Sequence, residues 1–264
     1  MELIAKISKG SRMDQVYIPK NRIGFPAGDY VIVKPLEREK QAEKLYFYNT
    51  EHIEPVKLEI VKGIIGIIDK SIGNENVIIT GSFVEQGFHF NDIDILLVTE
   101  SEANARFIEN AIENKVKIKT HIILLNNKTL VEGLSTDPLY QMMLSKCIAK
   151  KRFIYGVKSR INYKILDLHL LKSRTLIDNF DLLDGNEKHY LTRNMVAISL
   201  FLKNRKIGKE EVDKGIIRMF NLKNINEMKQ NILDKKAFLE KYKKIYKKTF
   251  DGILEGIKHG AEQE

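Results

Sequence analysis

The chain has few of the residues that build disulfide-bonded, fibrous or membrane-spanning proteins. Its 264 residues include one cysteine and five prolines, and no apolar run reaches the roughly 20 residues that a membrane-spanning helix needs. The single cysteine, Cys147, cannot form a disulfide within the chain, which favours a reducing compartment. Because residues 1–6 lack the apolar segment of a signal peptide, we expect a cytoplasmic protein with no membrane partner.

The residues that are abundant indicate a folded protein with more than one compact unit. Hydrophobic residues make up 43% and charged residues 30% of the chain, a composition typical of globular domains. The length exceeds the usual domain size of about 100 to 200 residues. We expect an α+β or α/β protein with a small β domain and linker at 1–50, a mixed sheet with helices at 51–156, and a helical bundle at 157–264.

The net charge of +9 is distributed unevenly along the chain. Residues 1–35 carry +3, residues 36–156 carry −2, and residues 157–264 carry +8. Clustered lysine and arginine gain affinity for phosphate by releasing counterions, so the two basic flanks suggest an anionic partner such as a nucleic acid. A lysine-rich, solvated surface is the alternative for the C-terminal part.

Short strands separated by turns are predicted for residues 1–35. Their order resembles the swapped-hairpin domains of the AbrB and SpoVT type, in which two chains interlock and basic hairpin residues contact DNA. The stretch between the two hairpin segments is shortened here, so DNA contact and dimerisation alone are both open. The resemblance implies a homodimer with these nucleic-acid-binding candidates: Lys9, Arg12, Lys20 and Arg22.

Two short motifs flank the apolar strands that are predicted in the central unit. Gly81 and Ser82 follow the strand expected at 77–80, and Asp92 and Asp94 open the next strand. A glycine lets backbone approach a triphosphate closely, and a hydroxyl with free amides at a turn can hold its terminal phosphate. Side chains two apart on a strand share a face, so the carboxylates converge and repel unless a cation lies between them. The pattern predicts a nucleotide site beside a Mg²⁺ or Mn²⁺ site.

This block resembles the minimal nucleotidyltransferases of the DNA polymerase β superfamily, whose signature is Gly-Ser, about ten residues, and then Asp-X-Asp on a strand. The matching stretch covers about 25 contiguous residues with the flanking apolar strands, and it implies a nucleotidyltransferase domain over roughly residues 55–156. It implies transfer of a nucleoside monophosphate, usually AMP from ATP, to a hydroxyl or similar acceptor with loss of pyrophosphate. Gly81 and Ser82 would bind the nucleotide, and Asp92 and Asp94 would bind metal and catalyse. A β-hairpin with an Asx turn is the structural alternative.

The third carboxylate that this family usually carries is absent from the strand expected at 116–125. Thr120 or His121 takes its place, and only one of the two can face the aspartates because side chains alternate along a strand. His121 could serve as a base near neutral pH or as a metal ligand, with an ordinary hydrogen-bonded histidine as the alternative. Glu85, in the loop after Ser82, is a further candidate ligand, with a solvated loop glutamate as its alternative.

Two functions therefore compete. The first is a Mg²⁺-dependent nucleotidyltransferase with Asp92, Asp94 and His121 as catalytic residues and a helical C-terminal part that helps to hold the acceptor. The second is a dimeric DNA-binding regulator with a degenerate transferase domain that binds nucleotide. The intact Gly-Ser and Asp-X-Asp groups favour the enzyme, whereas the missing acid and the basic N-terminal hairpin favour the regulator.

Residues 1–35 are predicted to hold two chains together. A β unit of this size cannot bury enough apolar surface to be stable alone, so we expect the intact chain to be a homodimer. A variant without residues 1–35 should be a monomer. Multi-angle light scattering of both proteins at micromolar concentration measures this, and a monomeric intact chain would contradict the swapped-hairpin interpretation.

Overall fold

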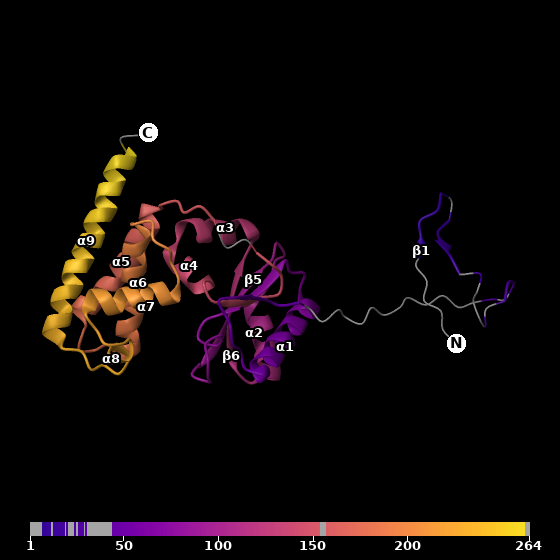
Figure 1. Ribbon diagram of the computed structural model, residues 1–264, viewed down its shortest axis with the longest axis horizontal. Coiled ribbons are helices and arrows are strands. Elements are labelled where there is room, and N and C mark those ends of the chain that lie inside the picture. The colour runs from indigo at the N-terminus through magenta and orange to yellow at the C-terminus, as the bar shows by residue number, and fades with distance from the viewer. Residues whose placement is uncertain are drawn as a thin grey trace. The chain divides into compact units, whose positions relative to one another are not determined.

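The computed structural model describes residues 7–11, 13–18, 20, 24, 26–28, 30, 44–153 and 157–261. Contacts divide the chain into two compact units, residues 1–44 and residues 45–264 (Figure 1). The first unit contains a short β-hairpin. The second contains the sheet and the helical C-terminal region.

The hairpin of the first unit pairs β1 (Ile7–Ser8) with β2 (Gln15–Val16) in antiparallel register. Gly10 lies in the connecting turn, where a Cβ atom would approach the carbonyl oxygen of Met13 to 2.1 Å. A side chain at this position would therefore displace the turn. The apolar side chains of Met13 and Tyr17 are largely exposed within the chain, and they would gain burial from the expected dimer.

The basic hairpin residues are described only in part. Lys9 and Lys20 are exposed, as a contact with nucleic acid would require. Arg12 and Arg22 lie outside the described residues, as do most residues of the strands expected near 3–7 and 30–34.

Among the described residues, the second unit has a five-stranded mixed sheet in the order β3-β7-β4-β5-β6. Only the pair β5 and β6 runs parallel; the other neighbouring pairs are antiparallel. The first of these strands, β3, lies within the segment 1–50 assigned to the small β domain and linker, and it is an edge strand of this sheet. The strands are β3 (Tyr46–Tyr48), β4 (Asn76–Thr80), β5 (Asp92–Val98), β6 (Lys119–Leu125) and β7 (Cys147–Ala149).

Alternation along β5 divides the sheet into two apolar faces. Ile93 and Ile95 pack with residues of α1 and α2 on one face, and Leu96 and Val98 pack with residues of α3 and α4 on the other (Figure 1). Asp92 lies on the second face, at the start of the strand, because it is an even number of residues from Leu96. These helices are α1 (Pro55–Ser71), α2 (Ala105–Val116), α3 (Asn127–Thr136) and α4 (Pro138–Leu144).

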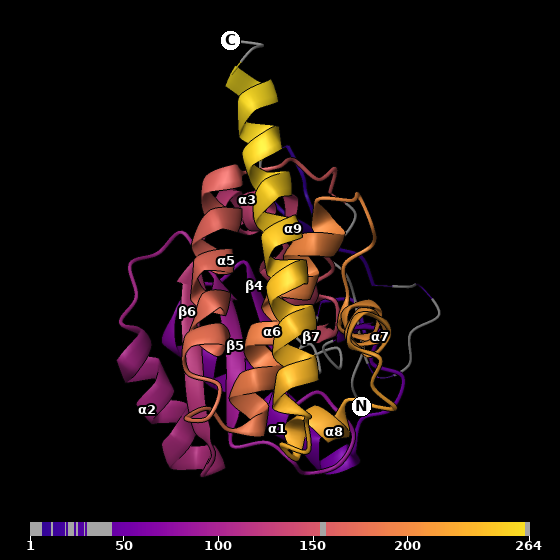
Figure 2. The same cartoon turned by 90° about the vertical axis from the view of Figure 1, so that its left-hand side faces the viewer.

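The C-terminal region is helical, and α9 lies along α5 (Figure 2). Its apolar core includes Met142 of α4, so the helices continue directly from the sheet-containing part. Tyr242 is fully buried and its hydroxyl donates to the carbonyl oxygen of Ser173 at 2.8 Å, which joins α9 to α5. The helices are α5 (Tyr163–Asp178), α6 (Gly185–Phe201), α7 (Lys209–Phe220), α8 (Asn226–Lys229) and α9 (Lys235–Ala261).

The predicted mixed α/β fold with a helical C-terminal region is confirmed. The strand expected at 116–125 is shorter in the structure, because α2 runs to Val116 and β6 begins at Lys119. Lys117 adopts a left-handed conformation with φ of 60° and ends the helix, so the strand starts later than the apolar pattern predicts. No helix in the described part of the chain is both long and apolar enough to cross a membrane.

Candidate functional site

The Gly-Ser turn lies directly against the second aspartate. Gly81 follows β4 with φ of +85°, and a Cβ atom there would lie 2.2 Å from Oδ2 of Asp94. Thr80, the residue before it, is paired with Asp94 across the antiparallel strands β4 and β5. Both the left-handed backbone and the close approach require glycine at position 81. The turn and the carboxylate pair therefore form one site.

The two aspartates share a face and are both partly buried. The side chain of Asp94 is 37% exposed, and Asp92 opens the strand opposite Lys119 of β6. Burial, followed by the negative charge of Asp92, raises the pKa of Asp94, while His121 and Lys209 oppose this shift. An ionised Asp94 is therefore held in an unfavourable position, as expected where a cation normally supplies the compensating charge.

The register of the parallel strands decides between Thr120 and His121. His121 is paired with Asp94, and its Nδ1 lies 3.7 Å from Oδ1 of that carboxylate. Thr120 is paired with Ile93, is only 4% exposed, and donates a hydrogen bond from its amide to the carboxylate of Glu113 of α2. The interpretation that Thr120 stands in place of the third acid is wrong, because its side chain faces the core. His121, with a side chain 62% exposed, is the residue beside the aspartates.

The carboxylate of Glu85 binds two lysines. Its Oε1 is 2.9 Å from Nζ of Lys209, and its Oε2 is 2.5 Å from Nζ of Lys146. These positive charges outweigh the effect of burial and lower the pKa of Glu85. Glu85 is therefore not simply a solvated loop residue, because it is paired with two lysines. These contacts do not support its assignment as a further metal ligand.

Lys209 connects the helical region to the Gly-Ser turn. It is the first residue of α7, and its Nζ donates to the carbonyl oxygen of Gly81 at 3.0 Å. Its backbone amide donates to the hydroxyl of Ser145 at 3.1 Å. Ser82, the next residue of the turn, is exposed, and its carbonyl oxygen accepts a hydrogen bond from the amide of Glu85 at 3.1 Å. One lysine thus contacts both the turn and the loop that follows it.

A buried ammonium group holds the loop between the two motifs. Lys57 of α1 is 0% exposed and donates to the carbonyl oxygens of Glu85 and Gly87 at 2.6 and 2.5 Å. Its charge is balanced by Glu54 at 3.0 Å. The amide of Gly87 and then Lys57 lower the pKa of Glu54 to about 2. Aromatic rings surround the ammonium group at 5.4 to 5.7 Å, namely those of Phe83, Phe88 and Phe90.

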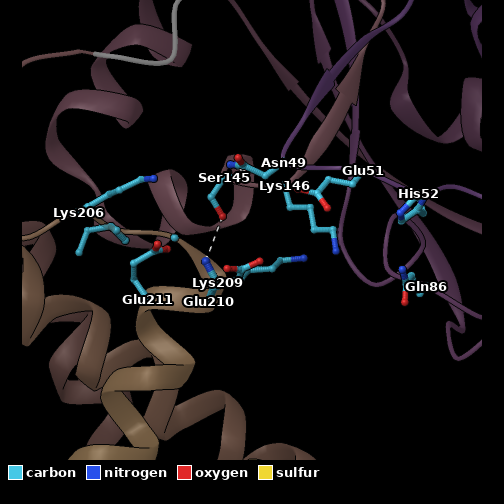
Figure 3. A pocket seen from close by; sticks show the side chains of 12 residues that line it. Asn49, Glu51, His52, Gln86, Ser145, Lys146, Lys206, Lys209, Glu210 and Glu211 are labelled. Carbon is cyan, nitrogen blue, oxygen red and sulfur yellow. Dashed lines mark hydrogen bonds between the residues drawn. The ribbon is translucent and has the colours of Figure 1, made fainter.

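A polar pocket of about 440 Å³ adjoins Lys209 and Lys146. Side chains from the start of α7 face side chains from the sheet-containing part across it (Figure 3). Its volume lies within the range of small-molecule sites. The lining residues are Asn49, Glu51, His52, Gln86, Ser145, Lys146, Lys206, Ile207, Gly208, Lys209, Glu210 and Glu211.

The fit to a divalent cation rests on two carboxylates. Among the described residues, no group of three or more His, Cys, Asp and Glu side chains is gathered closely enough to hold a metal ion. Asp92 and Asp94 nevertheless offer hard oxygen atoms on one face, and burial, followed by the charge of Asp92, raises the pKa of Asp94, an effect that a cation would oppose. These two residues fit Mg²⁺ or Mn²⁺ by donor chemistry.

Comparison with known proteins adds nothing to this geometry. No protein-family model, curated protein or solved structure gives a significant match to the chain. The function is therefore argued from the contacts of the site itself.

Sequence reasoning missed three lysines of this region. Lys57 had a signal, because it lies four and seven residues before Val61 and Ile64 on the apolar face of a predicted helix, where a charge is unexpected. Lys146 and Lys209 had none, because their contacts with Glu85 span 61 and 124 residues of sequence.

Replacement of Gly81 tests the contact between the turn and Asp94. We expect Gly81→Ala to lower the free energy of unfolding by about 1 to 3 kcal/mol, because the alanine strains a left-handed backbone and displaces the carboxylate. Gly87→Ala is the matched control, since Gly87 has φ of +79° but its added Cβ would meet only His89 at 3.7 Å. Urea denaturation measures both variants, and equal losses would show that the contact with Asp94 contributes nothing.

Replacement of Asp94 tests its unfavourable ionisation. An acid with a raised folded-state pKa favours folding below its unfolded pKa of 3.8 and loses that contribution as pH rises through the folded value. At neutral pH without metal, Asp94→Asn should therefore raise Tm by about 2 °C. Thermal denaturation should show the gain shrinking towards pH 4, and Mg²⁺ should stabilise only the original protein.

Asp69 is the control for that measurement, because its pKa is shifted in the opposite direction to that of Asp94. Its burial is outweighed by a hydrogen bond from Asn74 and by Lys150, so its pKa is lowered. Asp69→Asn should lower Tm at neutral pH. If both substitutions lower Tm equally, Asp94 is not held at an energetic disadvantage.

Proposed function

We propose that the protein is a Mg²⁺-dependent nucleotidyltransferase that transfers a nucleoside monophosphate, in the first instance AMP from ATP, to an acceptor hydroxyl. The observation that carries the proposal is the contact between the left-handed Gly81 backbone and Asp94, with His121 next to the same carboxylate. This contact joins a turn suited to phosphate with a pair of hard oxygen ligands.

The residues of the turn suit the phosphate end of the substrate. Gly81 has no side chain to block approach, and Ser82 is exposed and offers a hydroxyl. Lys209 lies beside Gly81 and adds positive charge to this end. The adjoining pocket is large enough for a nucleoside or a small acceptor, and its polar lining supplies hydrogen-bond partners.

The aspartates suit the reacting end. Asp92 and Asp94 would hold the cation, which when bound neutralises the triphosphate and the charge that develops on transfer. In the transfer, the acceptor oxygen bonds to the α-phosphorus, the bond from that phosphorus to the bridging oxygen breaks, and pyrophosphate leaves.

His121 suits the role of proton acceptor. The hydroxyl of the acceptor loses its proton as its oxygen attacks, and a neutral imidazole beside Asp94 can take that proton. The neighbouring carboxylate then faces the imidazolium that forms, at the distance of 3.7 Å between Nδ1 and Oδ1. An exposed histidine is open to an acceptor arriving from solvent, which favours a general-base role over a purely structural one.

The proposal is tested by incubating the protein with labelled ATP and Mg²⁺ and following pyrophosphate release and label transfer. Asp92→Asn with Asp94→Asn should abolish transfer and metal-dependent ATP binding. His121→Ala should reduce transfer by about 10²-fold or more while ATP binding is kept, since a positioned base contributes about that much. His89→Ala, at an exposed position of the loop, is the control and should not change the rate.

The same assay distinguishes the nucleotidyltransferase from the second candidate function, a DNA-binding regulator. ATP binding that does not depend on Mg²⁺ would remove the assignment of the aspartates. Binding without any release of pyrophosphate, together with salt-dependent binding of duplex DNA, would favour the dimeric regulator with a degenerate transferase domain.

A further inference from the structure

Two lysines and one glutamate meet beside the Gly-Ser turn in a way that a simple ion pair does not explain. Lys146 and Lys209 come from different parts of the chain, and each binds a different oxygen of Glu85, at 2.5 and 2.9 Å. Two ammonium groups face one carboxylate, so one positive charge remains uncompensated within this trio. Both lysines also line the polar pocket.

We infer that Lys146 and Lys209 form a binding site for a polyphosphate group and that the carboxylate of Glu85 occupies this site until such an anion displaces it. The inference deepens the proposed function and rests on it for the nature of the anion, the triphosphate of the nucleotide substrate. A carboxylate and a phosphate oxygen are both anionic acceptors for lysine, so one can replace the other without rearranging the donors.

The surroundings allow the exchange without unfolding the loop. The side chain of Glu85 is 39% exposed, so it can turn into solvent. The backbone of the same residue is held separately, because Lys57 binds the carbonyl oxygens of Glu85 and Gly87. A released carboxylate therefore leaves the loop in place and the two lysines facing the anion.

The arrangement gives Glu85 a role in selecting ligands. A monovalent anion competes poorly with a carboxylate that is tethered in place, because the tether gives Glu85 a high effective concentration. A polyphosphate carries several charges and reaches both lysines together with the exposed Ser82. Because of Glu85, only a ligand with several negative charges can displace the carboxylate and bind both lysines.

Binding of inorganic tripolyphosphate in the presence of EDTA and at low ionic strength tests the inference without any chemistry. Calorimetry should show that Glu85→Gln binds at least about fivefold more tightly than the original protein, and that Lys146→Met or Lys209→Met binds at least about fivefold more weakly. Glu59→Gln is the matched control, because Glu59 is an exposed glutamate paired with Lys62 at 2.7 Å, and it should not change the affinity.

Affinity of Glu85→Gln that is equal to or weaker than that of the original protein would overturn the inference and leave Glu85 as a structural link between the sheet and α7. Absence of tripolyphosphate binding in both proteins would overturn it as well. Should Glu85→Gln fail to fold, the intact protein decides: tripolyphosphate must protect Lys146 and Lys209 from an amine-reactive reagent more than it protects Lys150, which is paired with Asp69.

These results are separable from failure of the proposed function. Without metal, Asp92→Asn with Asp94→Asn should bind tripolyphosphate at least as tightly as the original protein, because two repelling charges are removed. A protein that releases Glu85 for tripolyphosphate but transfers no nucleotide would keep the anion site and lose the enzyme.

Discussion

The arrangement of the site depends on one buried charge, the ammonium group of Lys57. A charge that is 0% exposed is tolerated only when its donors are satisfied and an opposite charge is near. Here two carbonyl oxygens of the loop and the carboxylate of Glu54 meet that requirement. Because two of these acceptors belong to the loop after Ser82, satisfying Lys57 also fixes the course of that loop. The position of Glu85 follows from this constraint.

Apart from Lys57, the site contains one negatively charged group of side chains and one group with an excess of positive charge. The aspartates of β5 repel each other, and burial adds to the penalty on Asp94, whose pKa is raised. Next to Gly81, the two positive charges of Lys146 and Lys209 exceed the single negative charge of Glu85. Two repelling carboxylates next to two lysines that share one glutamate are unfavourable for stability alone. It suits a ligand that brings both a cation and a polyanion, as a metal-bound triphosphate does.

The sequence predicts the parts of this site whose residues lie close together along the chain. Gly81 and Asp94 lie thirteen residues apart, one directly after β4 and the other in the adjacent strand β5, and the period-two pattern of β5 predicts the face of both aspartates. The choice between Thr120 and His121 could not be made, because it depends on which residue of β6 lies opposite Asp94. A shift of one residue in register reverses every side chain, and it is the pairing of β5 with β6 that places His121 opposite Asp94.

Long-range pairing also connects the helical region to the Gly-Ser turn, and local sequence patterns do not predict it. Lys209 reaches Gly81 over 128 residues of sequence, a pairing that only the packing of the helices against α4 brings about. A fragment ending near residue 156 would keep the Gly-Ser turn and both aspartates. It would leave the Gly81 carbonyl oxygen without Lys209, Glu85 with one lysine instead of two, and Met142 without its helical neighbours. The sheet-containing part and the helical region therefore both contribute to the surroundings of the Gly-Ser turn, because the first residue of α7, Lys209, donates to the carbonyl oxygen of Gly81.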